Sequence, residues 1–203
     1  MASPKTIRNP IADHMLTSHN AALVVIDFQP VQVTSITTME RRALIANVVA
    51  LARTAKLYDL PIVLSSVNVK TGLNQPTIHQ ITEVLPDIDI IDRTSINAWE
   101  DEDFVAAVKA TGRKKLIMAA LWTEVCLVFP ALDAMNEGFE VYPVVDAVAG
   151  TSEEAHRAGL DRIMRAGARP TSWVQVICEL QRDWLRKETV PGFIDILFAF
   201  EGR

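Results

Sequence analysis

Short apolar runs alternate with amphipathic stretches along the whole chain of 203 residues. The apolar runs have the length of strands buried on both faces of a sheet, and they lie at 21–26, 62–65, 88–91, 116–121 and 139–145, with a further candidate at 171–174. The stretches between them carry apolar side chains at helical spacing, at 39–58, 77–85, 101–111, 123–138, 151–166 and 176–187. The pattern predicts a three-layer α/β/α sandwich around a six-stranded, mostly parallel sheet.

The two ends of the chain differ from this repeating middle. Residues 1–20 are polar and irregular, and we expect them to form an N-terminal arm. Residues 188–203 form an apolar tail, which we expect to dock on the core or on a neighbouring subunit. The sequence contains no internal repeat, low-complexity segment or linker, so we predict a single domain over 1–203.

The apolar run at 116–121 leads directly into a cysteine. Thr123 is a candidate helix N-cap, and Glu124 suits the positive end of the helix that follows. Cys126 then falls in the first helical turn, where free N–H groups and the helix dipole favour a thiolate over a thiol. The alternative is that Cys126 is simply a buried, small hydrophobic residue.

Two charged residues end other predicted strands, Asp27 the first and Arg93 the third. Parallel α/β sheets bind ligands beyond the carboxyl ends of their strands, where the strand order reverses. In the common order 3-2-1-4-5-6, the first and fourth strands flank that point, so Asp27 and Cys126 would face each other. A carboxylate in that place suits a general base, although aspartate also commonly caps a turn.

Other kinds of site lack their sequence signals. The four histidines show no metal-binding spacing, and they are His14, His19, His79 and His156. The loop after Asp27 has no glycine to bring N–H groups to a phosphate, and no Gly-x-Ser-x-Gly elbow marks a serine hydrolase. We therefore expect no metal and no cofactor, which leaves a cysteine nucleophile with an acidic partner.

Composition limits the partners and the compartment. The net charge of −5, without a long basic block, disfavours nucleic acid and anionic membrane surfaces as partners. No apolar run reaches the roughly 18 residues of a membrane span, and the N-terminus lacks the pattern of a signal peptide. Cys126 and Cys178 match no zinc or redox spacing, which predicts free thiols in a reducing cytoplasm. The expected partner is a small-molecule substrate.

Several motifs carry a family resemblance. They are Val-Val-Ile-Asp-Phe-Gln (24–29), Ser-Ile-Asn-Ala-Trp (95–99), Val-Lys-Ala-Thr-Gly-Arg-Lys-Lys-Leu-Ile (108–117), Leu-Trp-Thr-Glu-Val-Cys followed by Phe-Pro-Ala-Leu (121–132), and Glu-Leu-Gln-Arg-Asp-Trp (179–184). In these segments the chain resembles the isochorismatase-like cysteine hydrolases, and most strongly their YcaC-like subgroup. The most specific signal is Thr-Glu-Val-Cys together with the upstream aspartate at a strand end.

The resemblance implies a catalytic triad of Asp27, Arg93 and Cys126. In the family, the aspartate takes the thiol proton, the thiolate attacks a carbonyl carbon, an amine leaves, and water hydrolyses the thioester. The resemblance also places the oxyanion on the backbone N–H groups of Trp122 and Cys126. The bond between Leu121 and Trp122 lies where the family often has a cis peptide.

Two positions depart from the common family pattern. Arg93 stands where many members have lysine, and arginine holds charge and geometry but does not shuttle protons at neutral pH. The resemblance to the YcaC-like subgroup implies arginine at this position. Residues 66–69 lack the Asp-x-His cluster of nicotinamidases, which disfavours bound zinc and that activity.

Phe28, Asn97 and Trp99 are candidate residues of the substrate pocket.

The sequence thus predicts a metal-independent hydrolase of a C–N bond in a small amide-like substrate. One alternative is vinyl-ether hydrolysis of the isochorismatase type, which needs no cysteine nucleophile. Another is a non-catalytic, oligomeric binding protein that retains the fold. The YcaC-like resemblance implies a homo-oligomer, with an octamer as the expected form. A catalytic Cys126 is expected to react with iodoacetamide well below pH of about 8.5, and faster than Cys178.

Overall fold

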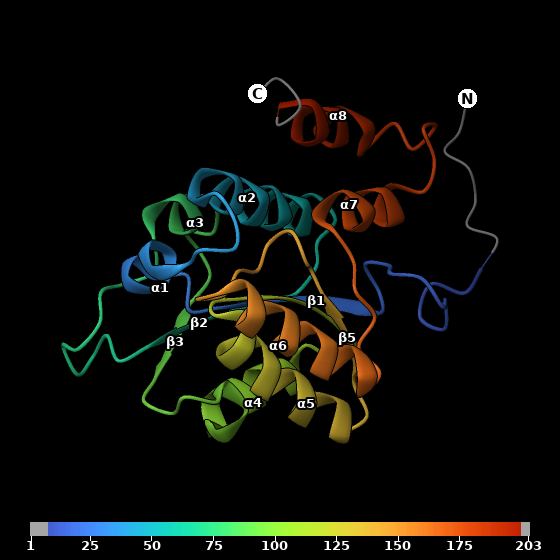
Figure 1. Ribbon diagram of the computed structural model, residues 1–203. Coiled ribbons are helices and arrows are strands. Elements are labelled where there is room, and N and C mark those ends of the chain that lie inside the picture. Colours follow the sequence, from blue (N-terminus) through green and yellow to red (C-terminus); the bar gives the residue numbers. More distant parts are fainter. Residues whose placement is uncertain (1–7, 200–203) are drawn as a thin grey trace.

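The computed structural model describes residues 8–199, in which a parallel sheet forms the middle layer (Figure 1). Its five strands are β1 (Ala21–Ile26), β2 (Ile62–Val67), β3 (Ile90–Arg93), β4 (Lys115–Ala120) and β5 (Glu140–Pro143). Their order across the sheet is β3-β2-β1-β4-β5, and each neighbouring pair is parallel. The predicted fold class and the predicted order of these strands are confirmed.

The central strands β1 and β4 are buried along their full length. Both consist almost entirely of apolar residues, which allows helices to cover the two faces of the sheet. In the strand register, Ile26 lies beside Ser65 of β2 and Ala120 of β4. The residues that follow these three strands therefore emerge side by side at one edge of the sheet.

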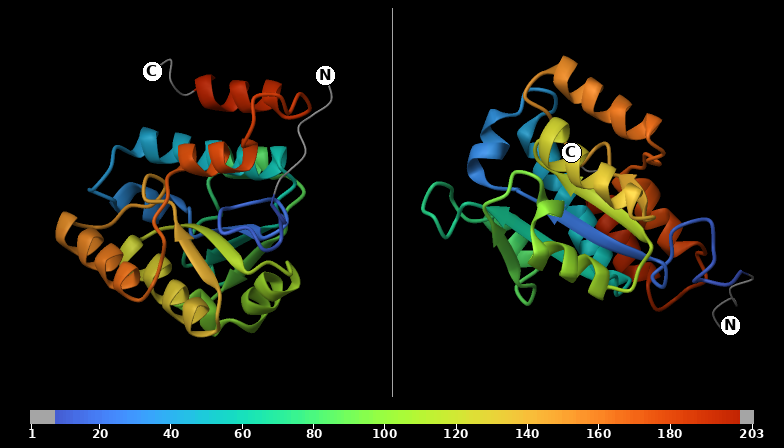
Figure 2. Two further views of the ribbon diagram at one scale, coloured as in Figure 1. Left: turned by 90° about the vertical axis from the view of Figure 1, so that its right-hand side faces the viewer. Right: turned by 90° about the horizontal axis from the view of Figure 1, so that it is seen from below.

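Helices pack on both faces of the sheet (Figures 1 and 2). One face carries α1 (Pro30–Ser35), α2 (Arg41–Leu57), α3 (His79–Val84) and α7 (Trp173–Gln181), with α8 (Val190–Ala199) outside α2 and α7. The other carries α4 (Glu102–Ala110), α5 (Val128–Asn136) and α6 (Glu153–Arg165). Because side chains alternate along a strand, Leu23 and Val25 of β1 enter the core on the first side, and Val24 and Ile26 enter the core on the second.

Polar side chains cap the helices that lead toward and away from the site. Asp101 accepts a hydrogen bond from the Phe104 N–H at the start of α4, and Ser152 accepts one from the Ala155 N–H at the start of α6. Each cap satisfies an N–H group that has no partner within its helix. These bonds explain where the two helices begin.

The predicted sixth strand at 171–174 is wrong. Thr171 forms only an isolated bridge to Val144, and α7 already begins at Trp173. The Ser172 hydroxyl accepts a hydrogen bond from the Gln175 N–H and so caps this helix. The Ser172 cap therefore starts a helix where a sixth strand was predicted. Within residues 8–199 the sheet has five strands.

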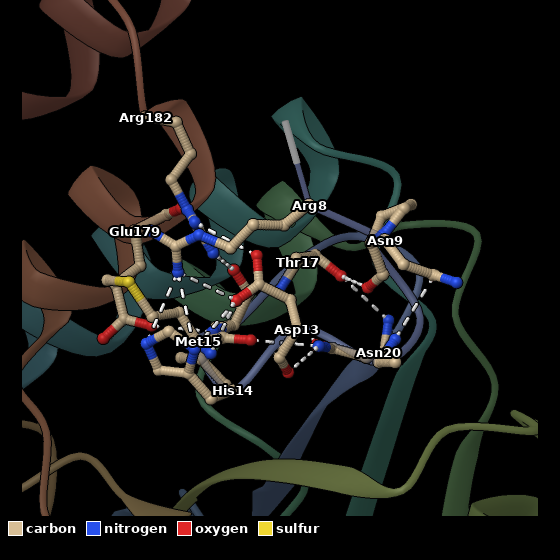
Figure 3. A network of polar contacts seen from close by, with 12 residues as sticks. Arg8, Asn9, Asp13, His14, Met15, Thr17, Asn20, Glu179 and Arg182 are labelled. Atoms are coloured by element: carbon tan, nitrogen blue, oxygen red, sulfur yellow. Dashed lines mark hydrogen bonds and ion pairs between the residues drawn. The ribbon is translucent and has the colours of Figure 1, made fainter. Parts of the chain in front are cut away.

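The described part of the N-terminal arm, residues 8–20, is held by a polar network around Asp13 (Figure 3). The buried Asp13 carboxylate lies 3.2 Å from Arg8 and 3.2 Å from Arg182, which follows α7. The Lys115 ammonium donates to the carbonyls of Asp13 and Met15 at 2.6 and 3.0 Å. The arm is thereby tied to the start of β4 and to the end of α7. Residues 1–7 lie outside the described range.

The apolar tail forms α8 within the described residues, and residues 200–203 lie outside them. Phe193 and Ile196 are buried against the rest of the protein. Ile194 and Phe198 are exposed, at 40% and 48%, so one side of the helix leaves large apolar side chains at the surface. Among residues 8–199, no helix has both the length and the apolar character that a membrane crossing requires.

Candidate active site

Asp27 follows β1 and lies at the edge where the central strands end. Its backbone is left-handed, with φ of 60°, a conformation that aspartate tolerates better than most residues. The Asp27 N–H donates to the Ser65 carbonyl at 3.0 Å, and the Asp27 carbonyl accepts from the Gln29 N–H at 2.8 Å. These two bonds fix the backbone of the turn. The Asp27 side chain is fully buried.

Asp27 and Arg93 form a bidentate ion pair. Nη1 of Arg93 donates to Oδ1 of Asp27 at 2.7 Å, and Nη2 donates to Oδ2 at 2.7 Å. Both side chains are completely shielded from solvent. A planar guanidinium matches a carboxylate in this fork geometry, whereas lysine offers a single charged nitrogen.

Arg93 ends β3, and β2 supplies most of its remaining contacts. Nη1 also donates to the Ser65 hydroxyl at 3.1 Å and to the Ser66 carbonyl at 3.0 Å. Nε has no hydrogen-bond partner among the described residues. Burial disfavours the charged guanidinium, but the hydrogen bonds and the negative charge of Asp27 outweigh burial and raise the pKa of Arg93. Arg93 therefore remains a fixed positive charge.

Cys126 lies on a π-helical turn, η2 (Thr123–Leu127), which follows β4 and leads into α5. The peptide bond between Leu121 and Trp122 is cis. The Leu127 N–H donates to the Trp122 carbonyl at 3.2 Å, five residues back along the chain. This wider turn places Cys126 in a buried position beside Asp27.

The start of this turn differs from the prediction. Trp122, not Thr123, takes the N-cap position, and it makes no side-chain capping bond. The Thr123 N–H already donates to the Ala149 carbonyl at 2.9 Å, and the buried Thr123 hydroxyl lies 2.8 Å from Nδ1 of His156 on α6. The N–H and the hydroxyl of Thr123 are therefore both occupied by contacts with distant parts of the chain, so Thr123 does not cap the helix.

The Cys126 thiol is held in its protonated form. Burial is the main cause that raises the pKa of Cys126, and the negative charge of Asp27 and a hydrogen bond from the thiol to that carboxylate raise it further. The positive charge of Arg93 and the Trp122 N–H act in the opposite direction but do not outweigh these causes. The expected thiolate is therefore wrong for this structure, because burial and a neighbouring carboxylate outweigh the helix terminus.

Phe28, which follows Asp27, and Trp122, which begins the cysteine turn, lie in different surroundings. Phe28 is fully buried within the larger core, where it supports the turn after β1. Trp122 is half-buried, and its indole N–H donates to the Ser35 hydroxyl of α1 at 2.9 Å. Contact of Phe28 with a substrate stays a prediction.

Asn97 and Trp99 both bind to α5. The Asn97 amide donates to the Asp133 carboxylate at 2.7 Å, and the Trp99 indole N–H donates to Glu137 at 2.9 Å. Trp99 is buried in the core on the α4–α5 side of the sheet. These contacts fix the loop after Arg93, and a direct role in substrate binding stays a prediction for both residues.

The fold and the Asp27–Arg93–Cys126 cluster can be compared with known proteins. Residues 21–175 match the family model of the isochorismatase domain. The chain belongs to the isochorismatase family. It is 42% identical over 170 residues to the probable hydrolase YcaC of Escherichia coli, which covers 83% of this chain and 81% of that protein. It is therefore a YcaC-like hydrolase of this family.

Two solved YcaC structures share this fold. YcaC from Pseudomonas aeruginosa, with hexane-2,5-diol and covalent acrylamide, superposes with a TM-score of 0.86 at 36% identity, over 93% of this chain and 95% of that chain. The Escherichia coli YcaC structure, described as an octameric hydrolase of unknown specificity, has a TM-score of 0.81 at 36% identity, over 94% and 98%. Both likenesses extend over nearly the whole of each chain.

Two buried polar residues that lie around the ends of strands β1 and β2 were not identified from the sequence. Ser65 accepts a hydrogen bond from Arg93 and also donates to the Ile91 carbonyl at 3.0 Å, so it joins β2 to β3. The buried Gln29 binds the N–H and the carbonyl of Val67 at 3.0 and 3.1 Å. The signal that could have pointed to Ser65 is a polar residue near the end of an otherwise apolar strand.

No group of three or more His, Cys, Asp or Glu side chains within residues 8–199 is arranged to hold a metal ion. The charges at the site are instead neutralised within the protein, because the Asp27 carboxylate already binds Arg93 through both of its oxygens. A metal-independent reaction stays a prediction for this chain.

Proposed function

We propose that this YcaC-like hydrolase cleaves the C–N bond of a small amide-like substrate with Cys126 as its nucleophile. The observation that carries the proposal is that the buried Asp27 and Cys126 follow the neighbouring parallel strands β1 and β4, near enough for the Asp27 carboxylate to raise the pKa of the thiol. A thiol held in this way needs a base to take its proton before it attacks, and the acceptor is already in place.

The proposed reaction begins with proton transfer from Cys126 to Asp27. The sulfur forms a bond to the carbonyl carbon, and the resulting oxyanion is held by the backbone N–H groups of Cys126 and Trp122. The C–N bond then breaks, Asp27 returns the proton to the leaving amine, and a thioester remains. Water attacks the thioester carbon, with Asp27 as the base, and the carboxylic acid leaves as the thiol re-forms.

Arg93 supports this sequence without exchanging protons. Before the transfer, its positive charge is balanced by Asp27, and after the transfer it is balanced by the thiolate of Cys126. The total charge of the buried group is therefore the same in both states. This matters because an uncompensated charge is costly to hold away from water.

The proposal is tested by ammonia release from a panel of small primary amides, with wild type, Cys126→Ser and Cys178→Ser. We expect wild type and Cys178→Ser to hydrolyse the same amides, and Cys126→Ser to be inactive. Undiminished hydrolysis by Cys126→Ser would overturn the mechanism. Hydrolysis of a vinyl ether but of no amide would favour the isochorismatase-type reaction, and failure to act on either class would favour a non-catalytic binding protein.

We further propose that the chain assembles with copies of itself, as the Escherichia coli YcaC structure is described as octameric. The exposed apolar side chains of α8 support this proposal. Both cysteines are free thiols, which suits a reducing cytoplasm.

A further inference from the structure

Glu124 belongs to the turn that carries Cys126 and ties this turn to another segment of the chain. One carboxylate oxygen of Glu124, Oε1, accepts hydrogen bonds from the Thr151 N–H at 2.9 Å and from the Thr151 hydroxyl at 2.6 Å. The other oxygen, Oε2, is buried and has no hydrogen-bond partner among the described residues. A buried oxygen without a partner lowers stability, so stability alone does not explain a glutamate at this position.

Gly150 and Thr151, here called the bridging segment, bind on their other side to the loop between α1 and α2. The Thr37 N–H donates to the Gly150 carbonyl at 3.0 Å, and the Thr37 hydroxyl donates to the Thr151 carbonyl at 2.9 Å. The Gly150 N–H donates to the Thr38 hydroxyl at 3.0 Å. The bridging segment therefore joins Glu124 to the loop that follows α1.

That loop belongs to the stretch of chain that begins at Asp27. α1 starts at Pro30, directly after the turn that contains Asp27. The indole of Trp122, at the start of the cysteine turn, also binds α1 through the Ser35 hydroxyl. Two separate sets of hydrogen bonds thus connect the turn bearing the thiol to the stretch bearing the carboxylate.

Close packing leaves Glu124 little freedom. A Cβ atom on Gly150 would lie 2.7 Å from Oε2 of Glu124 and 2.8 Å from Cβ of His156. A Cβ atom on Gly159 of α6 would lie 3.0 Å from Cα of Glu124. The small size of these two glycines allows the bridging segment and α6 to pack closely against the Glu124 side chain and backbone.

We propose that Glu124 is a positioning residue for the Asp27–Cys126 pair. Through the bridging segment, it sets the separation between the thiol and the carboxylate that accepts the thiol proton. Its catalytic consequence rests on the proposed function, but its effect on the thiol does not require a substrate. Proton transfer needs heavy atoms within hydrogen-bond distance, so a small displacement of the cysteine turn is enough to weaken it.

The test measures how the rate of Cys126 alkylation by iodoacetamide depends on pH, by mass spectrometry of the intact, full-length protein. The variants are Glu124→Ala, which removes the acceptor, and Glu124→Gln, which keeps an oxygen that can accept both bonds from Thr151. Glu154→Ala is the matched control, since Glu154 is an exposed glutamate of α6. The same samples are assayed for amide hydrolysis and for thermal unfolding.

We expect the midpoint of the Cys126 profile to fall by about one pH unit or more in Glu124→Ala, because the thiol moves away from Asp27. Amide hydrolysis falls by about tenfold or more, while Glu124→Gln and Glu154→Ala stay close to wild type. A folded Glu124→Ala with the wild-type profile would overturn the inference. If Glu124→Ala does not fold, Thr151→Val replaces it. This change removes only the hydroxyl bond, and we expect a smaller shift in the same direction; an unchanged profile overturns the inference.

Failure of the two proposals can be told apart. If wild type hydrolyses no amide but the profile of Glu124→Ala shifts, the proposed function fails and the positioning role stands. If wild type hydrolyses amides and Glu124→Ala retains both rate and profile, the positioning role alone fails.

Discussion

Arg93 and Asp27 meet through two hydrogen bonds of 2.7 Å in a place that solvent does not reach. The pair joins the end of β3 to the end of β1 across β2, whose Ser65 hydroxyl accepts a further bond from Arg93. Cys126 lies on the turn that follows β4, where the charges of both Asp27 and Arg93 act on its pKa. The electrostatic state of the thiol is therefore set by partners from other strands.

Asp27→Asn separates the reactivity of the thiol from catalysis. The Asp27 charge raises the pKa of Cys126 and Arg93 lowers it, so the substitution moves the pKa of the thiol downward. Iodoacetamide reacts with the thiolate, and we expect the alkylation profile to move to lower pH. We expect amide hydrolysis to be lost, because the proposed base is absent. The control is Asp161→Asn on the exposed side of α6, and a profile that moves to higher pH would contradict the explanation.

Removing Arg93 from the ion pair is expected to destabilise the fold. Arg93→Met leaves the Asp27 carboxylate buried without its partner, which costs about 3–5 kcal/mol in the free energy of unfolding. Arg93→Lys keeps the charge but loses the fork geometry, and we expect a smaller loss. Urea unfolding measures both. The double variant Asp27→Asn/Arg93→Met should lose less than the sum of the single losses, and simple additivity would show that the pair is not coupled.

Asp92 binds the loop after β2, and we expect its contribution to the free energy of unfolding to be lost in acid. Burial acts to raise the pKa of Asp92, but hydrogen bonds from the Lys70 N–H, the Val69 N–H and the Ser66 hydroxyl outweigh burial and hold the pKa below the usual 3.8. A lowered pKa contributes stability that is present above pH 3.8 and is lost as the pH falls through the folded value.

Urea unfolding of wild type and Asp92→Asn at several pH values measures this contribution. We expect wild type to be more stable near neutral pH, and the difference to narrow below pH 3.8. A difference that stays constant over the same range would show that the carboxylate charge of Asp92 is not the source of the stability.

Gly150→Ala and Gly192→Ala form a matched pair for the packing behind the cysteine turn. The new methyl at Gly150 would meet Cβ of His156 at 2.8 Å, which cannot move without its backbone, and we expect a loss of about 1–3 kcal/mol. The methyl at Gly192 would meet a terminal carbon of Leu57 at 2.6 Å, and that side chain can turn away. Thermal unfolding compares them, and an equal loss at both sites would contradict this difference.

The exposed side of α8 gives a test of self-association. Ile194→Ser together with Phe198→Ser removes exposed apolar groups and leaves the buried Phe193 and Ile196 in place. We expect a lower mass in light scattering, with Met164→Ser on α6 as the control. An unchanged mass would exclude this side of α8 from the subunit contact.

The sequence by itself determined that the strands β1 to β5 exist, because apolar runs of strand length alternate with amphipathic helices. Their order was predicted as the common one for such sheets. That order placed Asp27, Arg93 and Cys126 at one edge of the sheet. The sequence could not reject a sixth strand at 171–174, because the Ser172 cap that starts α7 there depends on one hydrogen bond.

Only the tertiary structure decided the chemical state of the cysteine. A local pattern contains the helix terminus that favours a thiolate, but not the burial or the Asp27 carboxylate that raise the pKa of the thiol. The tertiary structure alone also shows the partner of Glu124, because Thr151 is 27 positions away in the chain. Burial and long-range contacts arise when the whole chain packs, and the sum of these interactions sets the charge and the position of the Cys126 thiol.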